Sequence, residues 1–549
     1  MPPGISTLHD TPLHGEEGAA HYVQVGGLPE TCHSGVLPGG GRWWVVGIGI
    51  RCHALTCHFL GAADWQEVLS QPQPDLAVLD GHFVAVRRTE NRTEAFTDSL
   101  GTRTLYLAKR PGGIAFSTRV DWLATLCGGL SIDVAAFGSH WLAFNQLSTQ
   151  SQIKDIRRLG PGGHAVIQHG QLQVTESRFT PVIEESDPDG AEFIDTLSAF
   201  CNPADGRAVS LGLSGGLDSR LLLTLQGGPV HIFGPADQAD VRVAMRMATR
   251  VGLAPVHLYE GIPNAHACIA LLRERAATAQ ITSGASSLLG LRYYGALRER
   301  GLRVMDGALG EAARRQFMNR LLILGKGAIT GGNPQLILRC IRAARADIFN
   351  AEVLAAMMRG AMVEIEEEFA ALPPIAPEDA VDLLGVRARL PNFFGLEQNR
   401  LDGIAECYMP FAQPSVMRAV FRIPARLRKS GRMYRRLIRD RRPALARFPL
   451  VKDGRTYPFR LPALAAHMFT RARKYTSRLP AHTERARFLE TLKPFVLDTA
   501  HSEEVRTFTA YDAEKISRLV MDYYNGNTAR AAEVDWWLSF EMWRRMLKG

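Results

Sequence analysis

The feature that most constrains this chain is a short polar loop between a strand-like run and a helix-like run. The strand-like run is 208–213, the loop reads Ser214-Gly215-Gly216-Leu217-Asp218-Ser219, and 220–223 opens the helix. A glycine-rich turn at a helix N-terminus directs backbone N–H groups and the positive end of the helix dipole to one point. A phosphate group fits there, and Asp218 adds an oxygen ligand for phosphate-bound Mg²⁺. The loop therefore predicts a nucleotide-phosphate site in an α/β domain.

Around this loop, strand-like and helix-like runs alternate, in the order 209–213, 221–225, 230–233, 241–251 and 256–258. Such alternation is typical of βαβ units and predicts a parallel sheet. Beyond about Leu288 the pattern becomes mainly helical, so we expect a helical C-terminal region.

The first part of the chain has a different pattern, with short apolar runs separated by turns. The clearest runs are 44–50, 76–79, 82–86 and 164–167, and they predict strands. The polar segment 181–190 is rich in breakers, as a linker is. We therefore expect two domains, 1–182 and 190–549.

Composition excludes several classes of protein. Eight cysteines scattered through 549 residues predict reduced thiols and a cytoplasmic location. The Cys52-His53 and Cys57-His58 pairs lie on a strand-like run, where we expect a structural role.

No run reaches the ~18 apolar residues of a spanning helix, and the start lacks a signal-peptide pattern. Residues 426–478 hold seventeen Lys or Arg against two acids, yet no nucleic-acid motif accompanies them, so we expect a solvated basic face.

The loop is similar to the Ser-Gly-Gly-x-Asp-Ser loop of the ATP pyrophosphatases, and it is neither a Walker loop nor a dinucleotide fingerprint. With it, the chain resembles class B asparagine synthetases, β-lactam synthetase and the lasso-peptide macrolactam synthetases. The segments 98–106, 116–118 and 159–163 are similar to motifs of their N-terminal halves. The resemblance implies a glutaminase-like β-sandwich of the Ntn class, followed by an ATP-pyrophosphatase α/β domain.

The resemblance also implies ATP and Mg²⁺ as cofactors, together with particular site residues. Glu406 would accept the proton of the attacking amine, and Lys452 would stabilise charge on the phosphates. Asp218 and Glu311 would hold the metal. The residues implied for ATP and pyrophosphate are Leu213, Ser214, Gly215, Gly216, Asp218, Ser219, Phe233, Gly307 and Arg435.

A working glutaminase of this class needs a cysteine at the mature N-terminus. Here Pro2 follows Met1, and the context of Cys32 differs from the family's start. We therefore expect an inactive glutaminase-like domain and an acceptor amine other than ammonia from glutamine.

The function expected is a lasso-peptide macrolactam cyclase. It would adenylate an Asp or Glu side chain and close it with the N-terminal amine of a precursor or core peptide. A leader-peptide protease of the same pathway is a possible partner, and nucleic acid and membrane are not expected. Three alternatives stay open: a β-lactam or other small-molecule amide synthetase, an ammonia-using asparagine synthetase, and a non-enzymatic scaffold.

Overall fold

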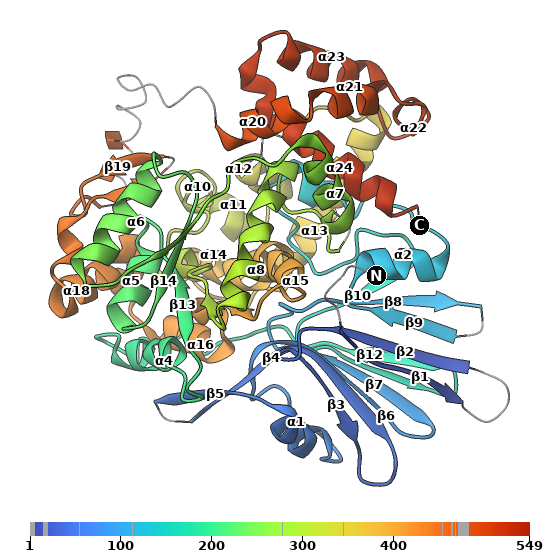
Figure 1. Cartoon of the computed structure of the whole chain (residues 1–549), viewed down its shortest axis with the longest axis horizontal. Coiled ribbons are helices and arrows are strands. Elements are labelled where there is room, and N and C mark those ends of the chain that lie inside the picture. The colour runs from blue at the N-terminus through green and yellow to red at the C-terminus, as the bar shows by residue number, and fades with distance from the viewer. Residues whose placement is uncertain are drawn as a thin grey trace.

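The computed structural model describes residues 6–14, 20–53, 55–111, 113–276, 278–343, 345–452, 454–462, 465–466, 468–469 and 483–548. Figure 1 shows the antiparallel strands of the N-terminal half beside an α/β body, with the last helices of the chain packed at one end of that body. The fold class expected from the sequence is confirmed at the level of mixed antiparallel and parallel sheets.

The N-terminal half contains antiparallel sheets. The larger sheet has the order β12-β11-β7-β6-β4-β3 with β5 on β4, a second has the order β10-β8-β9, and β1 pairs with β2. The strands are β1 (Ser6–His14), β2 (Ala20–Gly27), β3 (Cys32–Val36), β4 (Arg42–His53), β5 (Thr56–Phe59), β6 (Asp80–Arg88), β7 (Arg92–Thr97), β8 (Leu105–Arg110), β9 (Gly113–Ser117), β10 (Ile156–Leu159), β11 (His164–Gln168) and β12 (Gln171–Thr175).

These sheets form a sandwich because alternate residues of each strand face opposite sides. Trp44 and Val84 of the larger sheet share a buried core with Leu105 and Leu107 of the smaller sheet. The other face of the larger sheet packs against α1 (Ala62–Leu69). The other face of the smaller sheet packs against α2 (Val120–Cys127) and α3 (Gly138–Leu142).

The expected strands 44–50, 82–86 and 164–167 are confirmed within β4, β6 and β11. The strand expected at 76–79 is wrong. This segment is a turn in which the Leu79 N–H donates to the Leu76 carbonyl oxygen over 3.3 Å, and Val78 is exposed. An apolar run of four residues does not distinguish a strand from a turn that buries only its ends.

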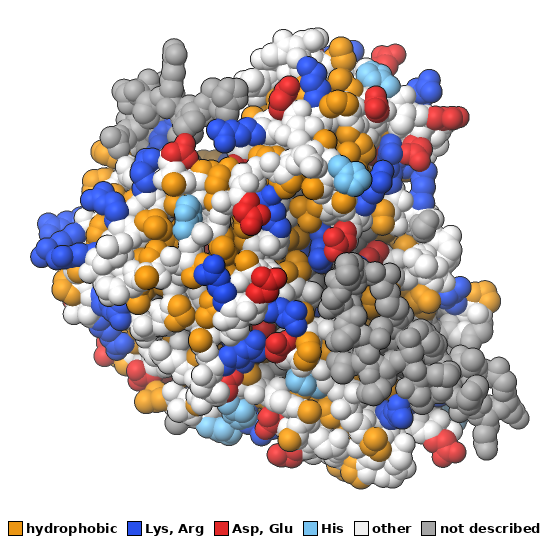
Figure 2. All heavy atoms as spheres, viewed as in Figure 1, with side chains coloured by type: hydrophobic (Ala, Val, Ile, Leu, Met, Phe, Trp, Pro, Cys, Tyr) orange, Lys and Arg blue, Asp and Glu red, His pale blue; other side chains and the backbone are white. Residues whose placement is uncertain are grey.

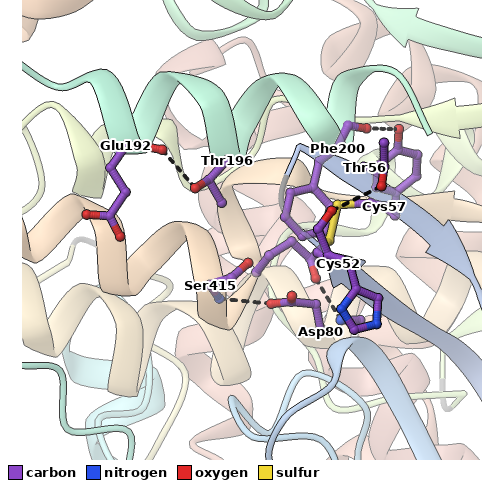
Figure 3. Close-up of a disulfide and its surroundings, with 12 residues drawn as sticks. Cys52, Thr56, Cys57, Asp80, Glu192, Thr196, Phe200 and Ser415 are labelled. Carbon is purple, nitrogen blue, oxygen red and sulfur yellow. Dashed lines mark hydrogen bonds between the residues drawn. A yellow bond between two sulfur atoms is a disulfide. The ribbon is translucent and has the colours of Figure 1, made fainter. Parts of the chain in front are cut away.

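The expectation that all cysteines stay reduced is also wrong. Cys52 and Cys57 are directly opposite each other in the β4–β5 hairpin and form a disulfide. Figure 3 shows this disulfide beneath the end of α4 (Ala191–Cys201), close to Phe200. The hairpin register brings the two cysteines together, which confirms a structural role for this segment. The other six cysteines lie outside any disulfide of the described chain.

The second half is built on a parallel sheet with the order β15-β14-β13-β16-β17. Its strands are β13 (Val209–Gly212), β14 (Val230–Phe233), β15 (Val256–Leu258), β16 (Arg303–Met305) and β17 (Cys407–Tyr408). Helices α5 (Asp218–Leu225) and α6 (Ala239–Arg250) connect the first three strands, which confirms the alternation expected from the sequence.

Helices cover this sheet and make up most of the chain that follows it. Between β15 and β17 lie α7 (Ala265–Arg275), η1 (Ala285–Leu291), α8 (Arg292–Glu299), α9 (Gly310–Ala313), α10 (Asn319–Leu324), α11 (Lys326–Gly331), α12 (Pro334–Ile341), α13 (Ala351–Ala370), α14 (Pro377–Leu384), the π-helix η2 (Gly385–Phe394) and α15 (Gly395–Leu401).

After β17 the described elements are η3 (Pro410–Ala412), α16 (Pro414–Arg422), α17 (Ala425–Arg428), η4 (Lys429–Gly431), α18 (Arg432–Arg441), η5 (Leu445–Arg447), the hairpin β18 (Leu450–Lys452) and β19 (Arg455–Tyr457), α20 (Glu484–Thr491), α21 (Lys493–His501), α22 (Glu503–Arg506), α23 (Ala513–Tyr524), η6 (Thr528–Arg530) and α24 (Ala531–Met546).

Buried polar contacts join the two halves. The Gly81 N–H donates to Oε1 of Gln413 over 2.7 Å. Arg158 Nη1 donates to Oδ1 of Asn392 over 2.6 Å. Breaking a buried hydrogen bond costs free energy, because the polar group left behind has neither its partner nor water. These two contacts therefore fix how the halves pack.

The basic segment 426–478 divides into outward and inward charges, and part of it, including Asp453 and residues 470–482, lies outside the described residues. Arg432, Arg439 and Arg441 are exposed on α18. Figure 2 shows Lys and Arg side chains gathered over this helix, as expected for a solvated basic face. Arg428, in contrast, is buried and paired with Asp382 over 2.6 Å. Within the described ranges, no helix combines the length and apolarity needed to cross a membrane.

Candidate nucleotide-phosphate site

The glycine-rich loop lies where the strand order of the parallel sheet reverses. β14 and β15 lie on one side of β13, whereas β16 and β17 lie on the other. Open α/β sheets bind their ligands at such a point, outside the carboxyl ends of the strands. The loop 214–219 follows β13, and the segment 306–311 follows the adjacent strand β16. Both predicted phosphate segments therefore emerge at this edge.

The loop is fixed by hydrogen bonds among its own residues. Oγ of Ser219 accepts from the Ser214 N–H over 3.1 Å, and the two hydroxyls are 2.9 Å apart. Oγ of Ser214 accepts from the Gly216 N–H over 3.1 Å. The Gly215 N–H donates to Oδ1 of Asp240, at the start of α6, over 3.0 Å. The expected loop residues therefore form one preorganised turn at the N-terminus of α5.

The segment after β16 packs against this turn. A Cβ atom at Gly307 would lie 3.3 Å from the backbone N of Ser219, and one at Gly310 would lie 2.5 Å from Cγ of Asp218. Only glycine allows so close an approach at Gly310. The structure therefore brings Gly307 to the loop, as expected.

Asp218 has a partner that the sequence analysis missed. Its carboxylate accepts two hydrogen bonds from Arg314, one from Nε over 2.6 Å and one from Nη2 over 3.0 Å. Both side chains are mostly buried. Such a forked pair is the strongest arrangement available to a carboxylate and a guanidinium.

The expected Mg²⁺ ligands do not fit a metal in this arrangement. Both carboxylate oxygens of Asp218 face the Arg314 guanidinium. Burial raises the pKa of Glu311, and the charge of Asp218 raises it further, which disfavours the charged form of this carboxyl. Within the described chain, no cluster of three or more His, Cys, Asp or Glu residues is placed to hold a metal. Asp218 and Glu311 are close together, but an arginine occupies the position expected for a cation.

Arg220 joins the loop to the segment that carries Lys452. Its guanidinium is fully buried and donates to the carbonyl oxygens of Leu445, Phe448 and Pro449 over 3.1, 2.9 and 2.7 Å, and to that of Gly215 over 3.3 Å. In addition, the Val451 N–H donates to the Gly215 carbonyl oxygen over 3.1 Å. The lysine segment therefore packs directly on the loop.

Lys452 itself is exposed at the end of β18, one residue beyond this contact. Arg435, on α18, lies close enough to Arg314 for the two positive charges to repel each other. Burial is the main cause that lowers the pKa of Arg435, and this repulsion adds to it. Its guanidinium hydrogen-bonds the Tyr457 side chain and lies over the Phe459 ring, while Nε and Nη1 are buried without a hydrogen-bond partner among the described residues. Buried unpaired donors beside a second cation favour an anion.

Of the two residues expected near the nucleotide base, Leu213 directly follows β13 and Phe233 ends the adjacent strand β14. The Leu213 N–H donates to the His231 carbonyl oxygen over 2.9 Å, so this donor is used by the sheet. Phe233, at the end of β14, stacks on Tyr293 and also contacts Tyr294, with ring centroids 5.5 and 5.1 Å apart. An aromatic cluster therefore stands at the carboxyl edge beside the loop.

The structure does not bring Glu406 to the loop. Glu406 precedes β17 and is level with Arg303, which pairs with Val209 at the amino end of β13. Ser214 is five residues beyond Val209, or about 16 Å along a strand. The Glu406 carboxylate is buried and lies 2.8 Å from Nε of Arg303 and 2.5 Å from Nη1 of Arg207. The residue expected to be the base therefore lies in a buried ion pair, away from the loop.

Cys32 does not have the properties of a glutaminase nucleophile. It lies at the start of β3, where its backbone N–H donates to the Leu28 carbonyl oxygen over 2.9 Å. Burial raises the pKa of its thiol to about 11, so the thiolate is scarce near neutral pH.

Asp306 is a second candidate that the sequence analysis missed. It is the first residue after β16, at the same edge as the loop, and accepts from the Ala308 N–H over 2.8 Å. Burial raises the pKa of Asp306. The pKa of Tyr294 is also raised, mainly by burial and further by the negative charge of Asp306. The available signal in the sequence is a carboxylate directly after a strand, since β16 ends at Met305.

Comparisons with known proteins give little beyond this geometry. No family model matches the sequence, and no curated protein matches it significantly. The glutamine phosphoribosylpyrophosphate amidotransferase of B. subtilis, solved with ADP and GMP, is 12% identical with a TM-score of 0.19; the match covers 50% of this chain and 63% of that one. An allosteric regulatory enzyme of purine biosynthesis is 12% identical with a TM-score of 0.18, covering 49% and 61%. The match spans less than two thirds of either protein. At these TM-scores the likeness carries no weight in assigning the site.

Proposed function

We propose that this chain is an ATP-dependent, AMP-forming amide synthetase whose phosphate site is the loop 214–219. One observation carries the proposal: the loop after β13 meets the segment after β16 at the point where the sheet order reverses. Backbone donors, two serine hydroxyls and the cationic side chains of Arg314 and Arg435 lie at this edge, and Lys452 follows Val451, whose N–H donates to the Gly215 carbonyl oxygen. Such a set suits a polyphosphate that leaves as a multiply charged group.

In the proposed first step, the substrate carboxylate attacks the α-phosphorus of ATP and pyrophosphate departs with both electrons of the broken P–O bond. The loop donors hold the leaving group, and Lys452 at the end of β18 stabilises the developing charge. In the second step, an amine attacks the acyl carbon, and AMP leaves as the amide forms. Asp306 is the side chain we assign as proton acceptor, because it lies at this edge and burial raises its pKa.

We propose a peptide N-terminal amine as the acceptor and an Asp or Glu side chain as the acyl donor, which gives a macrolactam. The N-terminal sandwich supports an Ntn-like domain, and Cys32 is buried in it at the start of β3, where we propose that it does not act as a glutaminase nucleophile. An amine already present in the substrate then replaces ammonia.

The experiment that tests this function supplies ATP, MgCl₂ and a candidate leaderless core peptide with a free N-terminal amine. We expect one AMP and one pyrophosphate for each peptide that loses one water, as followed by mass spectrometry and phosphate analysis. Asp306→Asn should form pyrophosphate yet slow amide formation by about 10²-fold or more. Exposed Asp237→Asn, on the loop before α6, is the matched control. ADP and inorganic phosphate as products would contradict the proposal.

A further inference from the structure

The ion pair between Asp218 and Arg314 occupies the point in the loop where a divalent cation was expected. The pair joins the first residue of α5 to the residue directly after α9, 96 positions away in sequence. Its forked geometry, 2.6 and 3.0 Å, uses both oxygens of Asp218. A carboxylate held in this way has no oxygen directed to a metal without breaking a charge-assisted bond.

The surrounding backbone holds Arg314 in place. Leu309 is fully buried and has a left-handed conformation with φ of 68°, which is costly for a bulky residue. This turn places Gly310 against Asp218, and the Arg314 N–H donates to the Gly310 carbonyl oxygen over 3.2 Å. Tyr434 of α18 closes the same region, with its hydroxyl 3.5 Å from that carbonyl oxygen. The backbone around Arg314 therefore holds this side chain beside Asp218.

The residue after Arg314 contacts a different acid. The neighbouring arginine, Arg315, turns away and pairs with Asp382 over 3.1 Å. Of two consecutive arginines, only Arg314 faces the loop.

We infer that Arg314 replaces the divalent cation at Asp218, so that the loop binds a pyrophosphate group without a metal ion bound to Asp218. A guanidinium has five N–H donors, and a forked pair with a carboxylate uses two of them. The other three can face phosphate oxygens, for which the planar group is well suited. Arg435, with two buried unpaired nitrogens among the described residues, adds a second cation from α18. This inference rests on the proposed function, whose phosphate site it describes in more detail.

The test measures binding of sodium pyrophosphate to the full chain by calorimetry, first in excess EDTA and then in millimolar MgCl₂. For the unaltered protein we expect dissociation constants that differ by less than about threefold. In Arg314→Gln, affinity in EDTA should fall by about 10- to 100-fold, the range for losing a hydrogen bond to a charged group. MgCl₂ should then restore part of it, because Asp218 is released. Arg314→Lys should be intermediate, since lysine keeps the charge but not the fork.

Arg432→Gln is the matched control, because it removes an exposed charge at the start of α18, the helix that carries Arg435, and the hydrogen-bond partner of Asp218 in the described chain is Arg314. Its affinity should equal that of the unaltered protein in both buffers. Pyrophosphate binding by the unaltered protein that is lost in EDTA and restored by MgCl₂ would overturn the inference while leaving the proposed function intact. Absence of binding in both buffers would overturn the inference and the proposed phosphate site together. The unaltered protein decides both outcomes, even if a variant does not fold.

Discussion

Arg220 donates a hydrogen bond to the carbonyl oxygen of Pro449 over 2.7 Å, across 229 positions of sequence. The same guanidinium reaches Gly215 of the phosphate loop. The loop and the segment leading to Lys452 are thus held together by one buried cation, which makes their relative position a property of the fold.

Arg220→Met should therefore uncouple the loop from the lysine segment. The change leaves four carbonyl oxygens, two in buried and two in part-buried bonds, without their shared donor. We expect a loss of at least about 3 kcal/mol in the free energy of unfolding. AMP formation should fall with it. Chemical denaturation measures the first effect, with Arg250→Met on the exposed face of α6 as control. Equal free energies of unfolding for the two variants would contradict this role of Arg220.

Lys452→Ala tests the exposed cation at the end of β18. Because Lys452 is exposed, the melting temperature should not change, whereas AMP formation should fall by about 10²- to 10³-fold if the side chain meets the leaving phosphates. Lys429→Ala removes another exposed lysine and should affect neither quantity. A normal rate for Lys452→Ala would show that this lysine faces only solvent.

Glu406→Gln should act on stability. The variant removes the negative charge that Arg303 and Arg207 share, while Arg303 keeps Asp205 over 2.6 Å and Arg207 keeps Glu30 over 3.5 Å. We therefore expect a loss of about 1 to 3 kcal/mol in the free energy of unfolding, as for one hydrogen bond to a charged group. Thermal unfolding should show the loss. At a temperature where the variant is folded, the ratio of pyrophosphate released to amide formed should match the unaltered protein. An accumulating acyl adenylate would instead return Glu406 to the role of base.

Asp80 gives a pH dependence of stability. It is buried, accepts from the Ser415 N–H over 2.8 Å, and burial raises its pKa from 3.8 to about 6. Between pH 3.8 and about pH 6, Asp80 holds a proton in the folded protein that it has released in the unfolded chain. The contribution of Asp80 to the free energy of unfolding therefore falls as the pH rises. The shift of about two pKa values corresponds to about 3 kcal/mol.

The measurement is the free energy of unfolding of Asp80→Asn relative to the unaltered protein, from about pH 4 to about pH 7. The variant should gain relative stability across that range, because Asn cannot ionise. Asp75→Asn, at an exposed position, serves as the control and should give a flat difference. If the difference in free energy of unfolding between Asp80→Asn and the unaltered protein also stayed constant with pH, the pKa of Asp80 would not be raised.

Local patterns predicted the turn at 214–219, the strands β4, β6 and β11 of the N-terminal half, and β13, β14 and β15 of the second half. The loop 214–219 is specified by consecutive residues, since a strand, two glycines and a helix start are adjacent in sequence. The alternation in β4 and β6 likewise follows from the two faces of a sheet. These features need no knowledge of distant contacts.

Features that depend on strand order were not predictable in this way. β17 is only two residues long, so the sequence gives little sign that Glu406 precedes a strand and lies at the opposite edge from Ser214. The pairing of Asp218 with Arg314 requires β13 and β16 to be neighbours. The Cys52–Cys57 disulfide depends on the register of the β4–β5 hairpin, which spacing alone does not fix.

The central claim is that ATP is cut between its α and β phosphates by a substrate carboxylate. The most direct measurement supplies a core peptide with ¹⁸O in its Asp or Glu carboxylate and examines the nucleotide products by mass spectrometry. We predict AMP carrying one ¹⁸O atom, in an amount equal to the amide formed, with unlabelled pyrophosphate. Appearance of ¹⁸O in inorganic phosphate together with ADP would contradict the account.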